Sequence, residues 1–274
     1  MCFFVRLILA KNPFNLAFLV AFASSSFAAS WQSSITKDPP GNFPSPPPLE
    51  ATYHFGWSGF TAATAEATYS KPSTDRCQLV GAGRTVYLAR ALWKFDVDYK
   101  SLANDRTMRP IESNQTEIYR SKRLTTQLNF TSSGVHRTRN ETPPNPANKP
   151  RDFNFPNLFD LHSALLYLRS QPLTDGSVYR IVVYPGTAAY LATFTVKRRE
   201  NISVHAGKFP SIKVDLRLQK VGKDLELEPH KKFRRASVWV SDDNLRLPLR
   251  AEAQIFIGTV FAELQSFQVQ TEKP

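Results

Sequence analysis

The octapeptide YHFGWSGF at residues 53–60 places a serine close to two glycines, as the nucleophile elbow of a serine hydrolase does. That elbow needs the spacing G-x-S-x-G on a turn from a strand into a helix. Here Gly59 comes one position too early, and the chain continues with alternating alanine and threonine, which is typical of a strand. Ser58 and Gly59 are ordinary residues of a tight hairpin turn. We therefore predict a hairpin and no hydrolase chemistry at Ser58.

The segment VGAGRTVY at residues 80–87 has a G-x-G pair before an expected helix, as a dinucleotide-binding loop has. The third glycine of that fingerprint is absent, and neither a parallel β-α-β pattern nor an acidic partner follows. We predict a strand that bends at Gly81 and Gly83.

Residues able to hold a metal do not have the spacing that a metal site needs. The histidines are isolated from one another and from Cys77, so no local zinc signature exists; they are His54, His136, His162, His205 and His230. Asp242 and Asp243 lie in SDDNLRLPLR, which lacks the alternating acids and the glycine of a calcium loop, so we predict a tight turn there. We expect no cofactor, no metal, no catalytic residues and no enzymatic activity.

The first 28 residues differ in composition from the rest. Arg6 and Lys11 precede an apolar run that ends in SSSFAAS, the pattern of a secretory signal with cleavage after Ala28. A membrane anchor is disfavoured because the run is shorter than the ~20 residues that span a bilayer. We predict an exported protein, periplasmic in a Gram-negative bacterium, that is not an integral membrane protein after cleavage. Cys77 would then be the one remaining cysteine, most simply a buried thiol.

The chain carries 35 Lys and Arg against 23 Asp and Glu, a formal net charge of +12. Such a charge favours anionic partners, including nucleic acid, anionic lipid and polysaccharide. Export argues against nucleic acid, and the positive residues are scattered in pairs and are not gathered on one helix. A solvated surface with no charged partner is the simpler alternative.

Alternating apolar and polar residues predict strands through most of the chain. The clearest cases are residues 53–57, 63–69, 212–219 and 247–257, with further strands near 178–184, 190–197, 236–241 and 259–267. Helical spacing predicts two short helices, within residues 86–95 and 159–172, the second with Asp160 as its N-cap. Short turns imply antiparallel pairing. The predicted fold is mainly β: a large curved antiparallel sheet, or half-barrel, with two short helices on its concave face.

Proline-rich segments divide the chain. We predict a signal peptide at 1–28, a Pro-rich linker at 29–49, one domain at 50–268 with a Pro-rich loop at 141–153, and a tail at 269–274.

The second half of the chain resembles an exported bacterial family catalogued as domain of unknown function 3108. The matching segments are DLHSALLYLRSQPLTDGSVYRIVVY, GKFPSIKVDLRL and VWVSDDNLRLPLRAEAQIFIGTVFAEL, and YHFGWSGFTAATAEATY is similar to the family's opening hairpin. The motif residues among them are Asp160, Gly176, Ser241, Asp242, Asp243, Pro248 and Gly258. The resemblance implies export to the cell envelope and a fold similar to the periplasmic lipoprotein-carrier (LolA/LolB-like) half-barrel, but it brings no established reaction.

Two functions follow as expectations. In the first, an acyl chain of a lipid or lipoprotein, or an apolar segment, binds in the half-barrel, between aromatic and small side chains and with arginines at its rim. That predicted set comprises Tyr53, Phe55, Trp57, Ala63, Ala65, Ala67, Arg169, Arg180, Trp239 and Arg250. In the second, a basic surface docks to an anionic envelope polysaccharide or to an outer-membrane assembly partner. The interior is equally well read as a packed core.

Overall fold

The computed structural model describes residues 31–229, 233–255 and 258–270. The predicted signal peptide, the first two residues of the predicted linker and the last four residues of the predicted tail lie outside them.

In this part of the chain the strands form one antiparallel sheet in the order β8-β7-β6-β5-β4-β3-β2-β1-β15-β14-β13-β11-β10-β9, with β12 paired to β11. β8 and β9 form its two edges, so the sheet is not closed. The strands are β1 (Leu49–Trp57), β2 (Phe60–Ser73), β3 (Arg76–Thr85), β4 (Phe95–Asn104), β5 (Pro110–Tyr119), β6 (Lys122–Thr131), β7 (Gly134–Thr142), β8 (Arg151–Asn154), β9 (Val178–Val183), β10 (Ala189–Val204), β11 (Gly207–Val221), β12 (Leu227–Pro229), β13 (Phe233–Ser241), β14 (Pro248–Ile255) and β15 (Gly258–Val269).

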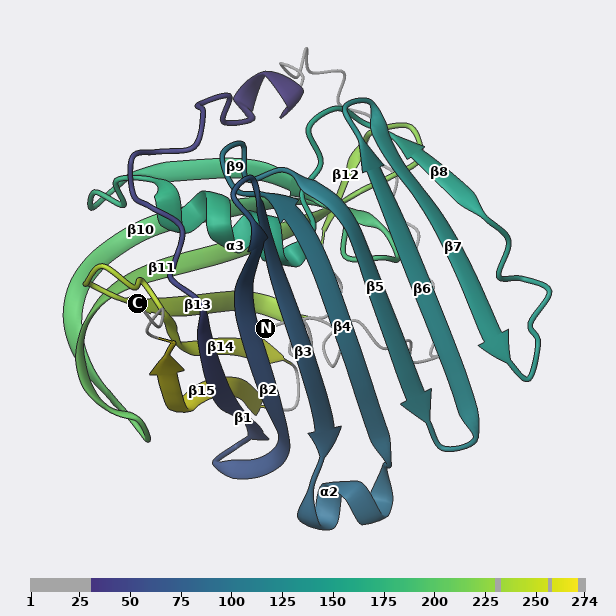
Figure 1. The fold of residues 1–274 in the computed structure, drawn as a ribbon, viewed down its shortest axis with the longest axis horizontal. Helices are drawn as coiled ribbons and strands as arrows, with labels where there is room; N and C mark the ends of the chain where they lie inside the picture. The colour runs from purple at the N-terminus through teal and green to yellow at the C-terminus, as the bar shows by residue number, and fades with distance from the viewer. Residues whose placement is uncertain (1–30, 230–232, 256–257, 271–274) are drawn as a thin grey trace, which may run out of the picture.

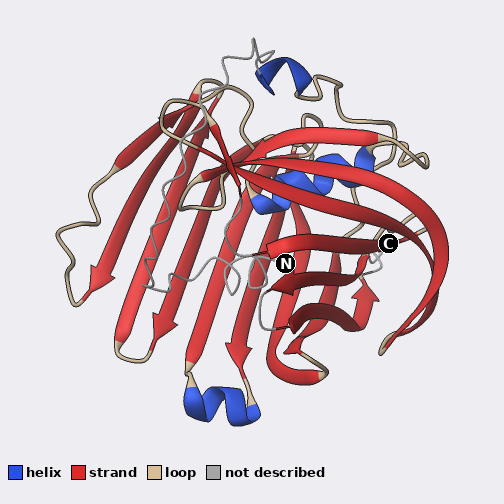
Figure 2. Cartoon of the chain, turned by 180° about the vertical axis from the view of Figure 1, so that it is seen from behind, coloured by secondary structure: helices blue, strands red, loops and turns tan. Residues whose placement is uncertain are grey.

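The two parts of the sheet cross in space. In Figure 1 strands β2–β8 form a wall of steep strands, and β10, β11 and β13–β15 run across behind it. The helix α3 (Leu161–Ser170) lies between them in both views, while α2 (Tyr87–Leu92) sits at the lower end of the wall (Figures 1 and 2). The prediction of one large antiparallel sheet is therefore confirmed.

Cross-strand pairing brings the predicted aromatic and small residues together. Phe55 lies opposite Ala63, and Tyr53 lies opposite Ala65. Phe55 and Ala63 are each 1% exposed and belong to the main hydrophobic core. The hairpin at Ser58 and Gly59 is confirmed, with positive φ at both residues, as a tight turn between right-twisted strands requires.

The helix α3 begins as predicted but is buried more completely than its leucine spacing indicates. Asp160 is its N-cap, and Ser163 completes a reciprocal capping box. Helical spacing in the sequence aligns Leu161, Leu165 and Leu168 in a stripe, but this stripe does not mark the buried face. Leu161 and Leu165 are only half-buried, while His162, Ser163, Ala164 and Tyr167 are buried. The sheet and the preceding chain cover α3 from several sides.

That preceding chain, residues 31–48, is a strap that docks on α3 and on the edge strand β9. It starts with the 3-10 helix η1 (Trp31–Ser34), and the Thr36 backbone and side chain bond to Arg180 of β9. Farther along, Gly41 and Phe43 bond to Ser170, and the Tyr167 hydroxyl donates to the Asp38 carbonyl. The Pro-rich segment does not join the sheet, but in the part described it is packed on the domain and is not a free linker.

The helix α2 does not cover the interior, contrary to the prediction of two helices on the concave face. None of its residues is buried, and Leu88 and Leu92 are each 72% exposed. The helical spacing is correct, but six residues at the end of a hairpin extend past the core and so their apolar side chains have nothing to pack against.

The strands β4–β7 have no counterpart among the strands that the alternation indicates. Their sequences mix polar residues into both faces, as in ESNQTE of β5, where Ser113, Gln115 and Glu117 are buried. Antiparallel pairing defines them where the side-chain pattern does not: β4 pairs with β3, β5 with β4, β6 with β5 and β7 with β6.

Candidate functional site

The outer face of β1, β14 and β15 carries an open groove of about 570 Å³. Its lining mixes hydroxyls, carboxylates, imidazoles and one aromatic ring: His54, Ser58, Gly59, Thr61, His205, Arg250, Glu252, Thr259, Phe261, Glu263 and Gln265. We call it the outer groove.

Strand periodicity places these side chains on one face. Along β15, Val260, Ala262 and Leu264 are buried in the main core, so the residues between them point to the other side of the sheet. β14 behaves in the same way, with Ala251 and Ala253 buried and Arg250 and Glu252 outward. His205 arrives from the β10–β11 turn, where its backbone N–H donates to a Glu263 carboxylate oxygen at 3.2 Å.

Arg250 holds the floor of the outer groove together. Its Nη1 lies 2.8 Å from a Glu263 carboxylate oxygen, and its Nε lies 2.7 Å from a carboxylate oxygen of Glu252. One cation therefore binds two carboxylates, which leaves excess negative charge in the groove when His54 and His205 are neutral. Burial lowers the pKa of His54, the charge of His205 acts in the same direction, and Glu263 opposes both.

The ring of Phe261 forms the apolar part of the groove by lying over Gly56, its cross-strand partner on β1. A Cβ at Gly56 would lie 2.3 Å from the ring atom Cζ and 2.3 Å from the Phe60 carbonyl oxygen. Only a residue without a side chain lets the ring approach the strand this closely.

We expect Gly56→Ala to lower the free energy of unfolding by about 2 kcal/mol, because overpacking at backbone atoms forces local shifts. Gly81→Ala is the matched control, since its added Cβ would meet only the Glu66 carbonyl oxygen at 3.4 Å. Urea unfolding of both variants measures the difference; equal stabilities would contradict this packing.

The predicted interior residues are only partly gathered. Tyr53 donates its hydroxyl to the Pro248 carbonyl at 3.1 Å, and burial raises its pKa. Phe55 and Ala63 are core residues, and Ala65 packs against the same core. Ala67 is half-buried, and Trp57 is 44% exposed at the β1–β2 turn. A cavity beside Asp160, lined in part by Tyr99 and Tyr184, measures about 10 Å³, which is too small for an acyl chain.

The predicted rim arginines and Trp239 do not converge on the interior. Arg169 is 3% exposed and donates to the Pro44 and Leu245 carbonyls, and burial lowers its pKa to about 10. It fastens the strap and does not face solvent, where a lipid head group would be. The indole of Trp239 donates to Glu200 at 2.7 Å, with the Lys213 ammonium over its ring. Arg180 is half-buried on β9, and Arg250 belongs to the outer groove.

A serine, a histidine and an aspartate do meet in the core. The Ser101 hydroxyl donates to Asp160 at 2.5 Å and lies 3.2 Å from Nδ1 of His162. Tyr99 also donates to Asp160, at 3.0 Å. All four side chains are buried, with Ser101 at 0% exposure, so the cluster anchors the start of α3 and is closed to a substrate. The cluster forms because β4 packs against the start of α3, although the two segments are about 60 residues apart in the chain. Sequence spacing therefore did not reveal it.

The remaining family-motif residues build turns. Asp243 accepts from the Leu245 and Arg246 backbone and from the Ser241 hydroxyl, as the predicted tight turn requires. Asp242 pairs with Arg199 at 3.0 Å, and Pro248 opens β14. Gly176 and Gly258 have positive φ at turns, and Gly258 lies against Trp57.

In the described residues no group of three or more histidine, cysteine and acidic side chains is arranged to hold a metal ion. Cys77 is fully buried, and burial raises the pKa of its thiol to about 11, as suits a core residue. The helices in the described part are too short or too polar to cross a bilayer.

Sequence reasoning named Arg250 but missed its groove neighbours. The signal that could have found Glu263 and Phe261 is the outward half of the alternation in β15, next to the outward half of β14. His205 has no such signal, because only the folding of the β10–β11 hairpin toward β15 brings it near.

Comparisons with known proteins address the fold. A family model described as protein of unknown function DUF3108 matches residues 51–265. A β-barrel-like protein of domain of unknown function DUF1849 from Brucella abortus has a similar structure, with a TM-score of 0.55 at 8% sequence identity, covering 82% of this chain and 99% of that one. No curated protein matches the chain in sequence.

Two further structures are less similar. A protein from Bacteroides fragilis, provisionally described as exported and given a YmcC-like fold, has a TM-score of 0.33 at 10% identity, covering 83% of this chain and 99% of that one. A protein from Parabacteroides distasonis, provisionally described as a lipoprotein, has a TM-score of 0.33 at 8% identity, covering 85% and 100%.

Proposed function

The chain belongs to the DUF3108 family of proteins of unknown function, and from that premise we propose that it is an exported, non-catalytic cell-envelope protein that binds a polysaccharide segment in the outer groove. Support for export comes from the basic, apolar and small-residue pattern of residues 1–28.

The main support for this proposal is the outer groove. It is the open concave region of about 570 Å³ whose lining combines Phe261 with hydroxyl, amide, carboxylate and guanidinium groups. Sugars present hydroxyls that both donate and accept hydrogen bonds, and an apolar ring face that packs on an aromatic side chain. Convergent polar groups beside one aromatic surface suit such a ligand.

The charge of the groove refines the expected ligand. Glu252 and Glu263 both contact Arg250, so the cation is already neutralised where a polymer would lie. A neutral, hydroxyl-rich stretch of polysaccharide fits this floor better than a carboxylated one. Arg250 contacts one oxygen of each carboxylate, and carboxylates fixed in this way are preset acceptors for the hydroxyl groups of a bound sugar.

Titration calorimetry tests the proposal with a neutral oligomer of N-acetylglucosamine and an acidic oligomer of alginate. We expect the neutral oligomer to bind more tightly, and Glu263→Gln or Phe261→Ala to weaken it about tenfold or more, as loss of a charged hydrogen bond or of an aromatic contact does. Gln127→Ala, on the exposed face of β6, is the control and should bind as the wild type does.

Absence of saccharide binding, or equal binding by the wild type and both groove variants, would contradict the proposal. An acyl chain between the two parts of the sheet stays a prediction with less support, because Phe55 and Ala63 are packed in the core. Native mass spectrometry of protein from the envelope fraction separates the two functions: a co-purifying lipid mass would favour the acyl chain.

A further inference from the structure

Six large apolar or aromatic side chains are exposed along one end of the sheet. Phe60, Tyr87, Leu88 and Leu92 are each 72–78% exposed, and Trp57 and Tyr119 are less so. We call this set the apolar rim. It occupies the β1–β2 turn, α2 and the β5–β6 turn, and Figure 1 shows these segments at the lower end of the wall.

Backbone and ring contacts make the apolar rim continuous. The Val86 backbone N–H donates to the Ala62 carbonyl at 2.9 Å, which ties α2 to the start of β2. On the other side the Arg120 N–H donates to the Lys94 carbonyl at 3.3 Å, and the rings of Trp93 and Tyr119 meet edge to face at 5.9 Å. The three segments therefore form one surface.

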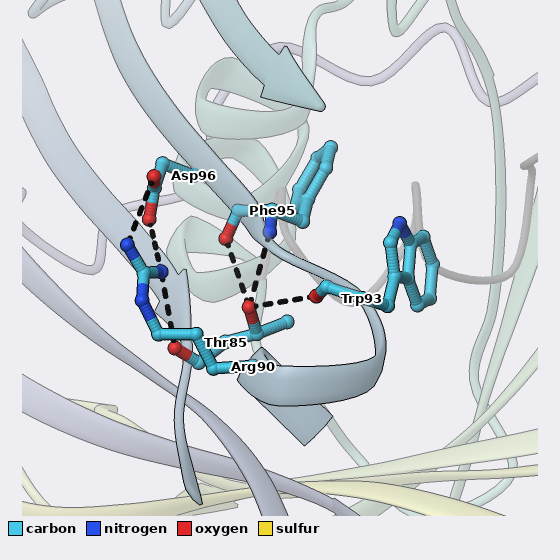
Figure 3. A network of polar contacts seen from close by, with 5 residues as sticks. All are labelled: Thr85, Arg90, Trp93, Phe95 and Asp96. Atoms are coloured by element: carbon cyan, nitrogen blue, oxygen red, sulfur yellow. Dashed lines mark hydrogen bonds and ion pairs between the residues drawn. The ribbon is translucent and has the colours of Figure 1, made fainter. Parts of the chain in front are cut away.

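A polar network fastens α2 to the neighbouring strands (Figure 3). Thr85 accepts from the Phe95 backbone N–H at 3.1 Å, and its hydroxyl lies 3.0 Å from the Trp93 carbonyl oxygen. Arg90 reaches Asp96 at 2.6 Å and the Thr85 carbonyl at 3.3 Å. The polar side of this short helix is thus bonded to the wall, and exposure of Leu88 and Leu92 is a property of the folded helix and not of a frayed end.

Positive charge lies beside the apolar rim, next to α2 and the β5–β6 turn. Lys94, Arg120, Lys122 and Arg123 are exposed there, while the nearby carboxylate of Asp96 is bound to Arg90 and that of Glu141 contacts Lys122. Arg120 also lies over the Tyr119 ring, 5.4 Å from its centroid. Within the described residues Lys94, Arg120 and Arg123 have no carboxylate partner, so the apolar and aromatic edge has free cations beside it.

We propose that the apolar rim docks the protein on the surface of a lipid bilayer that contains anionic lipid. Tryptophan, tyrosine, phenylalanine and leucine next to lysine and arginine are the composition that inserts at the boundary of head groups and acyl chains. The apolar rim lies at the end of the sheet, and Phe60, Tyr87, Leu88 and Leu92 are each 72–78% exposed there, so they are free to enter the boundary of a bilayer while the neighbouring cations meet its anionic head groups. The outer groove begins at the same β1–β2 turn, so a docked molecule holds the groove beside the membrane.

Co-sedimentation with vesicles tests this inference, using phosphatidylethanolamine with or without phosphatidylglycerol. The protein is purified from the envelope fraction in the form that the cell produces. We expect binding to the anionic vesicles that weakens with added salt. The double variant Leu88→Ser, Leu92→Ser should bind about tenfold more weakly or worse. Lys94→Gln with Arg120→Gln should weaken binding to anionic vesicles roughly twenty-five-fold, about fivefold for each charge.

Control variants make comparable changes at exposed sites outside the apolar rim: Val80→Ser with Val178→Ser, and Lys208→Gln with Lys223→Gln. Both should bind as the wild type does, and circular dichroism should give all variants the same melting curve, because every altered side chain is exposed. Failure of the wild type to bind anionic vesicles would overturn the proposal. An equal loss of vesicle binding in the rim variants and in the control variants would also overturn it. So would binding of one protein partner to the apolar rim in the absence of any vesicle binding.

Discussion

Replacing Asp160 by alanine is expected to lower the free energy of unfolding by about 4 kcal/mol. The carboxylate is 1% exposed and accepts from four donors: the Ser163 N–H, the Ser163 hydroxyl, the Ser101 hydroxyl and the Tyr99 hydroxyl. Loss of an N-cap costs about 1 kcal/mol, and each buried donor left without a partner costs about 1–3 kcal/mol. The individual costs add to a loss that a marginally stable domain withstands poorly.

Urea unfolding monitored by tryptophan fluorescence measures this loss. Asp175→Ala removes an exposed carboxylate that pairs with Arg199 at 2.6 Å, and it should change stability by less than about 1 kcal/mol. Asp160→Asn keeps the side-chain volume and one acceptor oxygen, so its loss of stability should lie between those of Asp175→Ala and Asp160→Ala. A loss below about 1 kcal/mol for Asp160→Ala would mean that the four donors find other partners, against the proposed role of Asp160 as the anchor of α3.

The two helices show what a local sequence pattern predicts and what it does not. Asp160 followed by Ser163 identifies the start of α3 because an N-cap is a contact between residues three apart in the chain. Local pattern does not show what each helix packs against. Leucine spacing is similar in α2 and α3, yet α3 is enclosed by strap and sheet, and α2 stands at the sheet end with Leu88 and Leu92 exposed. Amphipathic spacing indicates a helix and not what covers it.

The same limit applies to the arginines. In the sequence Arg169 and Arg250 look alike, because each follows a leucine. Arg169 lies near the end of a helix and Arg250 lies in a strand. In the fold Arg169 bonds carbonyls of the strap and of the β13–β14 turn, and Arg250 bonds two outward carboxylates from β14 and β15. Which partner each cation meets depends on contacts across more than 75 residues for Arg169, and on the strand register for Arg250. Neither is encoded in local spacing.

The Asp160 cluster also predicts how stability depends on pH. His162 is 3% exposed, and burial lowers its pKa to about 4, with Asp160 opposing. An unfolded chain returns the imidazole to a pKa near 6.5. Between pH 6.5 and pH 4 the unfolded state therefore binds more protons than the folded state, so stability falls as the pH falls through this window. We expect His162 alone to account for about 3 kcal/mol of the loss between pH 7 and pH 4.

The variant His162→Asn isolates this contribution, since asparagine places an amide near Ser101 but cannot take up a proton. It should be less stable than the wild type at pH 7, and its stability should then fall less steeply, by about 3 kcal/mol, on acidification to pH 4. His136→Asn is the control, because that imidazole lies at the surface against Asp152. The difference between the wild-type and His162→Asn curves, compared with the difference for His136→Asn, reports on His162. Parallel curves for the wild type and His162→Asn would show that the folded protein protonates this imidazole as readily as the unfolded chain does, against the lowered pKa that its burial predicts.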